Sequence, residues 1–219
     1  LQLVLGWSMG AQQTYEWMVR YPDMVKRAAP IAGTAQVTPH DRLFIEAHKE
    51  MIRSDPAWND GFYTEPHAVL TGLRRHALIW SVMGLSTQFY HQTEQAWERA
   101  GFQSVDDFMA NFWEDWFLPM DPNDLLTMAT KWQHGDVSRN TDGDLEAALG
   151  RVEAKVYVMP FEEDMFFPVS DCEYEESMIP DSELRPIDSL WGHFTMFGVF
   201  DEDLEAIDEH VGELLDESV

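Results

Sequence analysis

Apolar and polar positions change period several times along the chain, and each change predicts a boundary between elements. A short apolar run at residues 2–5 predicts a strand that ends at Gly6, and helical spacing follows at residues 9–21. A second apolar run at 28–32 predicts another strand. Strand, helix and strand in this order form a βαβ unit, which implies a parallel sheet.

The middle of the chain has only helical patterns. Thr38, Pro39 and Asp41 supply a hydroxyl N-cap, a proline in the first turn and an acid at the third position. They predict a helix that continues to about residue 54. Residues 66–134 predict further helices, broken near Gly84 and Gly101 and rich in aromatic residues. Most of these aromatic side chains are expected to pack helices together, and a minority to line a pocket.

Strands return after this insertion. Residues 155–159 predict a strand, followed by a loop at 160–168, a helix at 169–177 and a short strand at 184–187. Apolar residues at 204, 207, 211 and 214 predict a final amphipathic helix with an acidic outer face. We therefore expect an α/β core made of residues 1–37 and 141–219, with a helical lid at 38–140.

Composition excludes several classes of partner. The net charge is −26, with 40 acidic residues against 14 lysines and arginines, and such a surface repels nucleic acids and anionic membranes. No apolar run is long enough to span a bilayer. Cys172 is the only cysteine, which excludes an internal disulfide and fits a cytoplasmic location. No Cys or His cluster has the spacing of metal ligands, so we expect no metal.

The segment Gly6-Trp7-Ser8-Met9-Gly10 has the form G-x-S-x-G and lies between a predicted strand and a predicted helix. A serine at such a sharp turn is exposed as a nucleophile, and small neighbours let the backbone pass close to it. The pattern alone is weak, but its context favours a nucleophile over a structural turn.

A serine nucleophile needs a base and an orienting acid, which follow it in the order acid, then histidine, in this arrangement. Asp164 follows the strand at 155–159, and His193 follows the strand at 184–187. Glu162 and Glu163 compete with Asp164, which we prefer because the apolar residues after it would anchor the turn in the core. The other histidines are interpreted as mostly solvated on polar helix faces: His40, His48, His67, His76, His91, His134 and His210.

Five segments resemble the homoserine O-acetyltransferase-like branch of the α/β-hydrolases, and together they cover essentially the whole chain. They are Ser8-Met9-Gly10 with residues 16–22, residues 52–56, residues 120–126, residues 164–168, and Gly192-His193. The resemblance implies an α/β-hydrolase fold, with a mostly parallel sheet and a helical lid. It also implies Ser8 as acyl-accepting nucleophile, His193 as general base and acid, and Asp164 as the group that orients the imidazole. The backbone N–H of Met9 would supply one oxyanion donor. The loop that normally supplies the other donor, and the opening strands of the sheet, are expected to precede Leu1.

We therefore predict an enzyme that moves an acyl group from an ester or thioester to a hydroxyl acceptor through acyl-Ser8. An ester hydrolase is the alternative, and a non-catalytic binding protein is less consistent with a complete triad. The expected partners are a small-molecule acyl donor and acceptor, and the oligomeric state considered is a homodimer. No bound cofactor is expected, and acetyl-CoA would serve only as a co-substrate.

Departures from the family pattern concern the substrate. The candidate substrate-binding residues are Arg74, Arg75, Trp7 and Phe194. Seven residues after the two arginines the family's tyrosine is absent, and Phe194 occupies the place of its aspartate after the histidine. We therefore expect homoserine itself to be a poor acceptor.

Overall fold

The computed structural model describes residues 1–91 and 95–219, which divide into two compact units. Leu1–Val37 and Gly135–Val219 form the first unit, and Thr38–His134 form the second. The insertion was predicted to begin at residue 38 and to end at residue 140, so its end lies earlier than expected. The reason is that residues after 134 pair with the segment before 38. Val37 N–H donates to the Gly135 carbonyl at 2.9 Å, and Val137 N–H donates to the Ala35 carbonyl at 3.1 Å.

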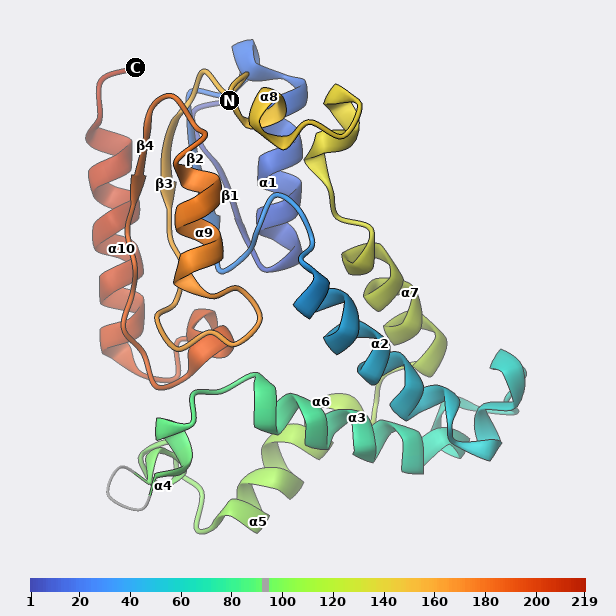
Figure 1. Cartoon of the computed structure of the whole chain (residues 1–219). Coiled ribbons are helices and arrows are strands. Elements are labelled where there is room, and N and C mark those ends of the chain that lie inside the picture. The colour runs from blue at the N-terminus through green and yellow to red at the C-terminus, as the bar shows by residue number, and fades with distance from the viewer. Residues whose placement is uncertain (92–94) are drawn as a thin grey trace. The chain divides into compact units, whose positions relative to one another are not determined.

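Four parallel strands form the sheet of the first unit, in the order β1-β2-β3-β4 (Figure 1). The strands are β1 (Val4–Trp7), β2 (Arg27–Ile31), β3 (Lys155–Val158) and β4 (Ser182–Leu184). The helices are α1 (Met9–Arg20), η1 (Pro22–Met24), η6 (Val137–Thr141), α8 (Leu145–Leu149), α9 (Val169–Glu176), η7 (Gly192–Phe197) and α10 (Asp201–Asp216).

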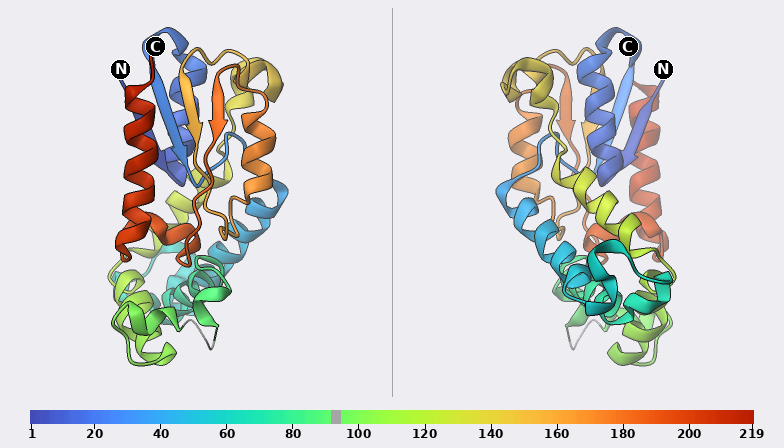
Figure 2. Two further views of the ribbon diagram at one scale, coloured as in Figure 1. Left: turned by 90° about the vertical axis from the view of Figure 1, so that its left-hand side faces the viewer. Right: turned by 90° about the vertical axis from the view of Figure 1, so that its right-hand side faces the viewer.

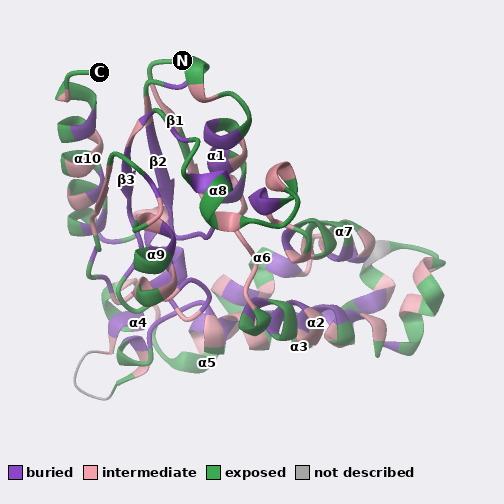
Figure 3. Ribbon diagram, turned by 45° about the horizontal axis from the view of Figure 1, so that its top comes forward, coloured by how far each residue is buried: buried purple, intermediate pink, exposed green. Residues whose placement is uncertain are grey.

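Helices cover both faces of this sheet. Figures 1 and 2 show α10 on one face, with α1 and α9 on the other. Side chains alternate along each strand, so Ala29 and Tyr157 pack in one cluster with Ile207 and Leu214 of α10. The central strands β2 and β3 are mostly buried, while the outer surface of α10 is exposed (Figure 3). The amphipathic pattern at the C-terminal end therefore encodes a helix docked on the sheet.

The predicted last strand is shifted. It was expected at residues 184–187, whereas β4 ends at Leu184. Ile187 instead makes an isolated parallel bridge with Phe161, beyond the end of β3. The residues of β4 are set by their pairing with β3, and this pairing cannot be predicted from a local apolar run.

The second unit is helical. Its elements are α2 (Pro39–Arg53), η2 (Pro56–Gly61), η3 (Pro66–Val69), α3 (Leu70–Met83), η4 (Gln88–Tyr90), α4 (Ala96–Arg99), α5 (Val105–Phe108), the π-helical η5 (Met109–Glu114), α6 (Asp115–Phe117) and α7 (Pro122–Gln133). The predicted start of α2 is confirmed, since Thr38 and Asp41 form a reciprocal capping box. Among the residues that the structure describes, no helix is long and apolar enough to cross a membrane.

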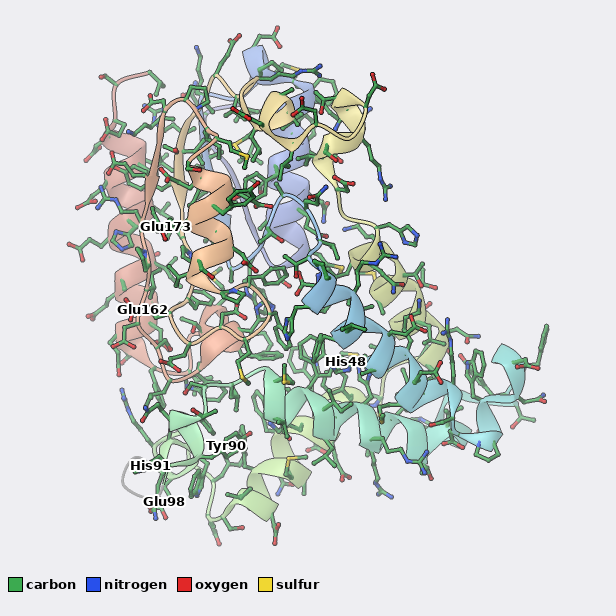
Figure 4. The ribbon with its side chains drawn as sticks, viewed as in Figure 1. His48, Tyr90, His91, Glu98, Glu162 and Glu173 are labelled. Carbon is green, nitrogen blue, oxygen red and sulfur yellow. The ribbon has the colours of Figure 1, made fainter. Side chains whose placement is uncertain are left out.

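His48 on α2 and His76 on α3 are buried together inside this unit, so the prediction that they are solvated is wrong. Their Nδ1 atoms lie 3.1 Å apart, and only 3% and 4% of the two residues is exposed (Figure 4 labels His48). Trp80 Nε1–H donates to His76 Nε2 at 2.9 Å. Because that nitrogen accepts, His76 carries its proton on Nδ1 and donates it to His48. Both rings are therefore neutral.

The buried pair predicts that the second unit loses stability in mild acid. Burial lowers the pKa of His76 from 6.5 to about 4, and burial together with His76 lowers the pKa of His48. The unfolded chain then binds more protons below pH 6.5, so stability is present above that pH and falls as the pH drops towards 4. For His76 alone the loss between pH 7 and 5 is about 2 kcal/mol.

Urea unfolding of the full-length protein at pH 7, 6 and 5 measures this loss. The His76→Leu variant should show a shallower dependence on pH than wild type, whatever its stability at pH 7. His40→Gln, at an exposed position on α2, should keep the wild-type dependence. An unchanged slope in His76→Leu would contradict the assignment.

Candidate active site

Ser8 stands alone between the last residue of β1 and the first residue of α1. Its backbone has φ 58° and ψ −121°, a left-handed conformation that is rare for a residue with a side chain. The Ser8 N–H donates to the Ile31 carbonyl of β2 at 3.0 Å, which holds the turn in this conformation. Strain of this kind is found where the surrounding structure fixes a functional group.

Two glycines make room for the turn. A Cβ at Gly6 would lie 2.2 Å from the Gly10 carbonyl oxygen, and one at Gly33 would lie 2.7 Å from the Ser8 carbonyl oxygen. Neither position accepts a side chain without moving backbone, so both glycines are required for β1, α1 and the turn after β2 to meet. Gly6 belongs to the sequence motif, whereas Gly33 is brought to it only by the fold.

The acid and the histidine follow the next strands of the same sheet. Asp164 lies in the loop after β3, and His193 lies in η7, after β4. Because the strands are parallel, their carboxyl ends lie along one edge of the sheet, where sites in α/β proteins form. Side chains separated by more than 150 positions in the chain therefore converge there.

Ser8, His193 and Asp164 form a continuous chain of hydrogen bonds. The imidazole Nε2 is 2.9 Å from Ser8 Oγ, and Nδ1 is 2.7 Å from Asp164 Oδ2. The other oxygen of Asp164 accepts the backbone N–H groups of Phe166 at 2.8 Å and Phe167 at 3.2 Å. The carboxylate is acceptor-only, so Nδ1 carries the imidazole proton and Nε2 is free to accept from the serine hydroxyl.

The geometry distinguishes among the three candidate acids. Asp164 is 4% exposed and bonded to the imidazole, whereas Glu162 and Glu163 are exposed. Figure 4 labels Glu162 on the loop that follows β3. The backbone N–H of Glu162 donates a hydrogen bond to the Ile187 carbonyl at 2.9 Å. Glu162 therefore stabilises the loop through its backbone, and its exposed carboxylate is not bonded to His193.

Aromatic rings surround the imidazole of His193, a residue that is only 2% exposed. The ring centroids of Phe166 and Trp7 lie 4.9 and 5.3 Å from it. Those of Phe167 and Phe194 lie 5.5 and 5.9 Å away. Surroundings of low polarity strengthen the bond between imidazole and carboxylate, because water does not compete for it.

The remaining predicted residues are placed as follows. Met9 is the first residue of α1, so its N–H lies in the first helical turn, where no intrahelical acceptor is available. Phe194 is 6% exposed and packs on Trp7 at 6.2 Å. Arg74 and Arg75 are exposed on α3 in the second unit.

Both arginines have partners within their own unit. Arg74 Nε donates to Glu114 at 3.0 Å, and Arg75 Nη1 donates to Ser54 Oγ at 3.2 Å. Their role towards a substrate carboxylate stays a prediction. Within residues 1–91 and 95–219, no group of three or more His, Cys, Asp or Glu is arranged to hold a metal ion.

Nearly the whole of this chain is similar to part of several solved and curated enzymes, although no protein-family model matches it. Ethyl acetate hydrolase from Pseudomonas veronii is 54% identical over 215 residues, which cover 98% of this chain and 61% of that protein. The structure of an acetylester hydrolase from Corynebacterium glutamicum superimposes with a TM-score of 0.96 at 52% identity, over 99% of this chain and 62% of that one. The chain therefore has the α/β-hydrolase fold.

The resemblance to homoserine O-acetyltransferases is also confirmed, at a greater distance. The enzyme of that name from Methanococcoides burtonii is 32% identical over 203 residues, or 87% of this chain and 41% of that protein. The chain spans about three-fifths of the length of its esterase relatives. The higher identity of the esterases favours the ester-hydrolase alternative over acyl transfer to a hydroxyl compound.

Proposed function

We propose that this protein is a serine esterase that hydrolyses short-chain carboxylic esters, acetate esters in particular, through an acyl-Ser8 intermediate. The observation that carries the proposal is the continuous chain of hydrogen bonds from Ser8 Oγ through His193 to Asp164. Relatives named as an ethyl acetate hydrolase and an acetylester hydrolase, at 54% and 52% identity, support acetate esters as the substrate class.

The first half-reaction acylates the serine. Ser8 Oγ attacks the ester carbonyl carbon while its proton passes to His193 Nε2. Asp164 holds the resulting imidazolium at Nδ1, and the N–H of Met9 donates to the oxyanion at the positive end of α1. The tetrahedral intermediate then expels the alkoxide, which takes the proton from Nε2 and leaves as the alcohol.

The second half-reaction repeats these steps with water. His193 Nε2 removes a proton from a water molecule as that molecule attacks the acyl carbonyl, and returns it to Ser8 Oγ as the carboxylic acid leaves. No bound cofactor is needed, because the ester supplies the acyl group and water accepts it. An acetyltransferase would differ in two molecules: a hydroxyl compound would attack the acyl-enzyme in place of water, and acetyl-CoA would be the donor.

Product partitioning tests esterase against transferase in the full-length protein. We expect free acetate to account for nearly all acyl groups released from ethyl acetate, even with homoserine and other small alcohols added, because the esterase relatives are 52–54% identical to this chain over the aligned residues. The measurement quantifies free acetate and acetylated alcohol together. The same assay with acetyl-CoA as donor should release little product.

Two other outcomes contradict the esterase proposal. If an acetylated alcohol dominates, the transferase is the correct function, and efficient acetylation of homoserine would also overturn the interpretation of Phe194. If neither donor is consumed at a rate above that of Ser8→Ala, the chain is not an acyl-transfer enzyme, and a binding role remains.

A further inference from the structure

Trp7 connects the strand that carries the nucleophile to the main chain of the histidine. It is the last residue of β1 and immediately precedes Ser8. Its indole Nε1–H donates to the carbonyl oxygen of His193 at 3.0 Å. One side chain therefore links the backbone segments that carry two members of the triad.

The indole ring adds packing contacts to the same segment. Its centroid is 5.3 Å from that of the His193 ring at an interplanar angle of 32°, and 5.5 Å from that of Phe197 in an edge-on arrangement. Trp7 also packs against the core cluster between the sheet and α10. The indole is thus held by the core on one side and holds η7 on the other.

We propose that Trp7 is a positioning residue, which keeps His193 Nε2 within reach of Ser8 Oγ. This inference rests on the proposed esterase mechanism. It differs from the role expected from the sequence, where Trp7 was a candidate for contact with substrate. Proton transfer depends steeply on the distance of 2.9 Å between the two atoms. Loss of the indole N–H removes a restraint on η7 and lowers the fraction of molecules in which that distance is kept.

Two replacements separate the hydrogen bond from the ring. Trp7→Phe keeps an aromatic ring and removes the donor, and the unnatural residue β-benzothienylalanine keeps the bicyclic shape while sulfur replaces the N–H. Both should lower kcat for ethyl acetate by about tenfold and leave KM within twofold of wild type, as expected when one hydrogen bond that orients the catalytic group is lost. Trp17→Phe, at an exposed tryptophan of α1, is the matched control and should behave as wild type.

A second readout reports the position of the imidazole directly. In the wild type, the His193 Nδ1 proton shared with Asp164 should give a far-downfield proton resonance. In both Trp7 variants this resonance should broaden or move upfield, while Trp17→Phe leaves it unchanged. A residue that only stabilised the fold would lower the melting temperature without this change.

The outcomes separate this inference from the proposed function. If wild type hydrolyses ethyl acetate and the benzothienylalanine variant matches it in kcat and in the resonance, the positioning role is wrong. If the variants raise KM alone, Trp7 contacts substrate and the inference is equally overturned. If wild type is inactive, the esterase proposal fails, and an unchanged resonance in the variants would reject the positioning role independently.

Discussion

Ser8→Ala is expected to lower ester turnover by about 10⁴-fold or more, because no acyl-enzyme can form without the hydroxyl. The substitution is conservative for the fold. Alanine and serine both carry a Cβ, so the left-handed backbone at φ 58° is equally strained in the two proteins. The loss is therefore chemical, and the melting temperature should stay close to that of wild type. Turnover of ethyl acetate by the full-length protein measures the effect.

A fluorophosphonate probe gives an independent readout, because it reacts covalently with an activated serine. It should label wild type at Ser8 and fail to label Ser8→Ala. Ser170→Ala, at an exposed serine on α9, is the matched control and should be labelled as wild type is. Labelling that persists in Ser8→Ala, or an active wild type that is not labelled, would show that another residue is the nucleophile.

The first three strands, to within two residues, and the nucleophile turn could be predicted because their signals are local. Gly6, Ser8 and the apolar runs around them lie within a short segment, and the turn imposes its demands on neighbouring residues. Gly33 gave no such signal. A Cβ at Gly33 would lie 2.7 Å from the Ser8 carbonyl oxygen, so the position must be glycine, and only the pairing of β1 with β2 brings the two segments together.

The burial of His48 is indicated by the spacing of apolar residues along α2, although the sequence pattern was interpreted as a solvated face. Phe44, His48 and Ile52 follow one another at intervals of four residues, so His48 shares a face of α2 with two buried apolar side chains. That spacing indicates burial. The hydrogen-bond partner of His48 could not be predicted from the sequence, because His76 reaches His48 only when α3 packs on α2. A lone histidine on an apolar helix face therefore predicts that its side chain is buried and hydrogen-bonded, but it does not identify the other residue of that hydrogen bond.

The choice of Asp164 over its neighbours depended on the apolar residues that follow it. The structure gives the physical reason: the backbone N–H groups of Phe166 and Phe167 hold one carboxylate oxygen, which aims the other at His193. Phe166 and Phe167 are both fully buried. The side chains that anchor the turn thus also fix the donors that orient the acid. No pattern of charges along residues 162–164 carries this information.

Asp164→Asn is expected to lower turnover by about 10⁴-fold, the loss typical of this change in serine triads. The amide oxygen of the new side chain would keep the bonds from Phe166 and Phe167, which places its NH₂ against His193 Nδ1. Since the NH₂ group is a donor, Nδ1 must accept and the imidazole proton moves to Nε2. That nitrogen then cannot accept the Ser8 proton.

Glu162→Gln and Glu163→Gln are the matched controls, because they make the same chemical change at exposed positions of the same loop. Both should retain nearly wild-type turnover of ethyl acetate, with Asp164→Asn inactive at an unchanged melting temperature. The fluorophosphonate reaction should slow in parallel with turnover, since it depends on the same base. If Glu163→Gln is the inactive variant and Asp164→Asn is active, a different carboxylate orients His193 in the working enzyme, and the bond between Asp164 and His193 is not the one that catalysis uses.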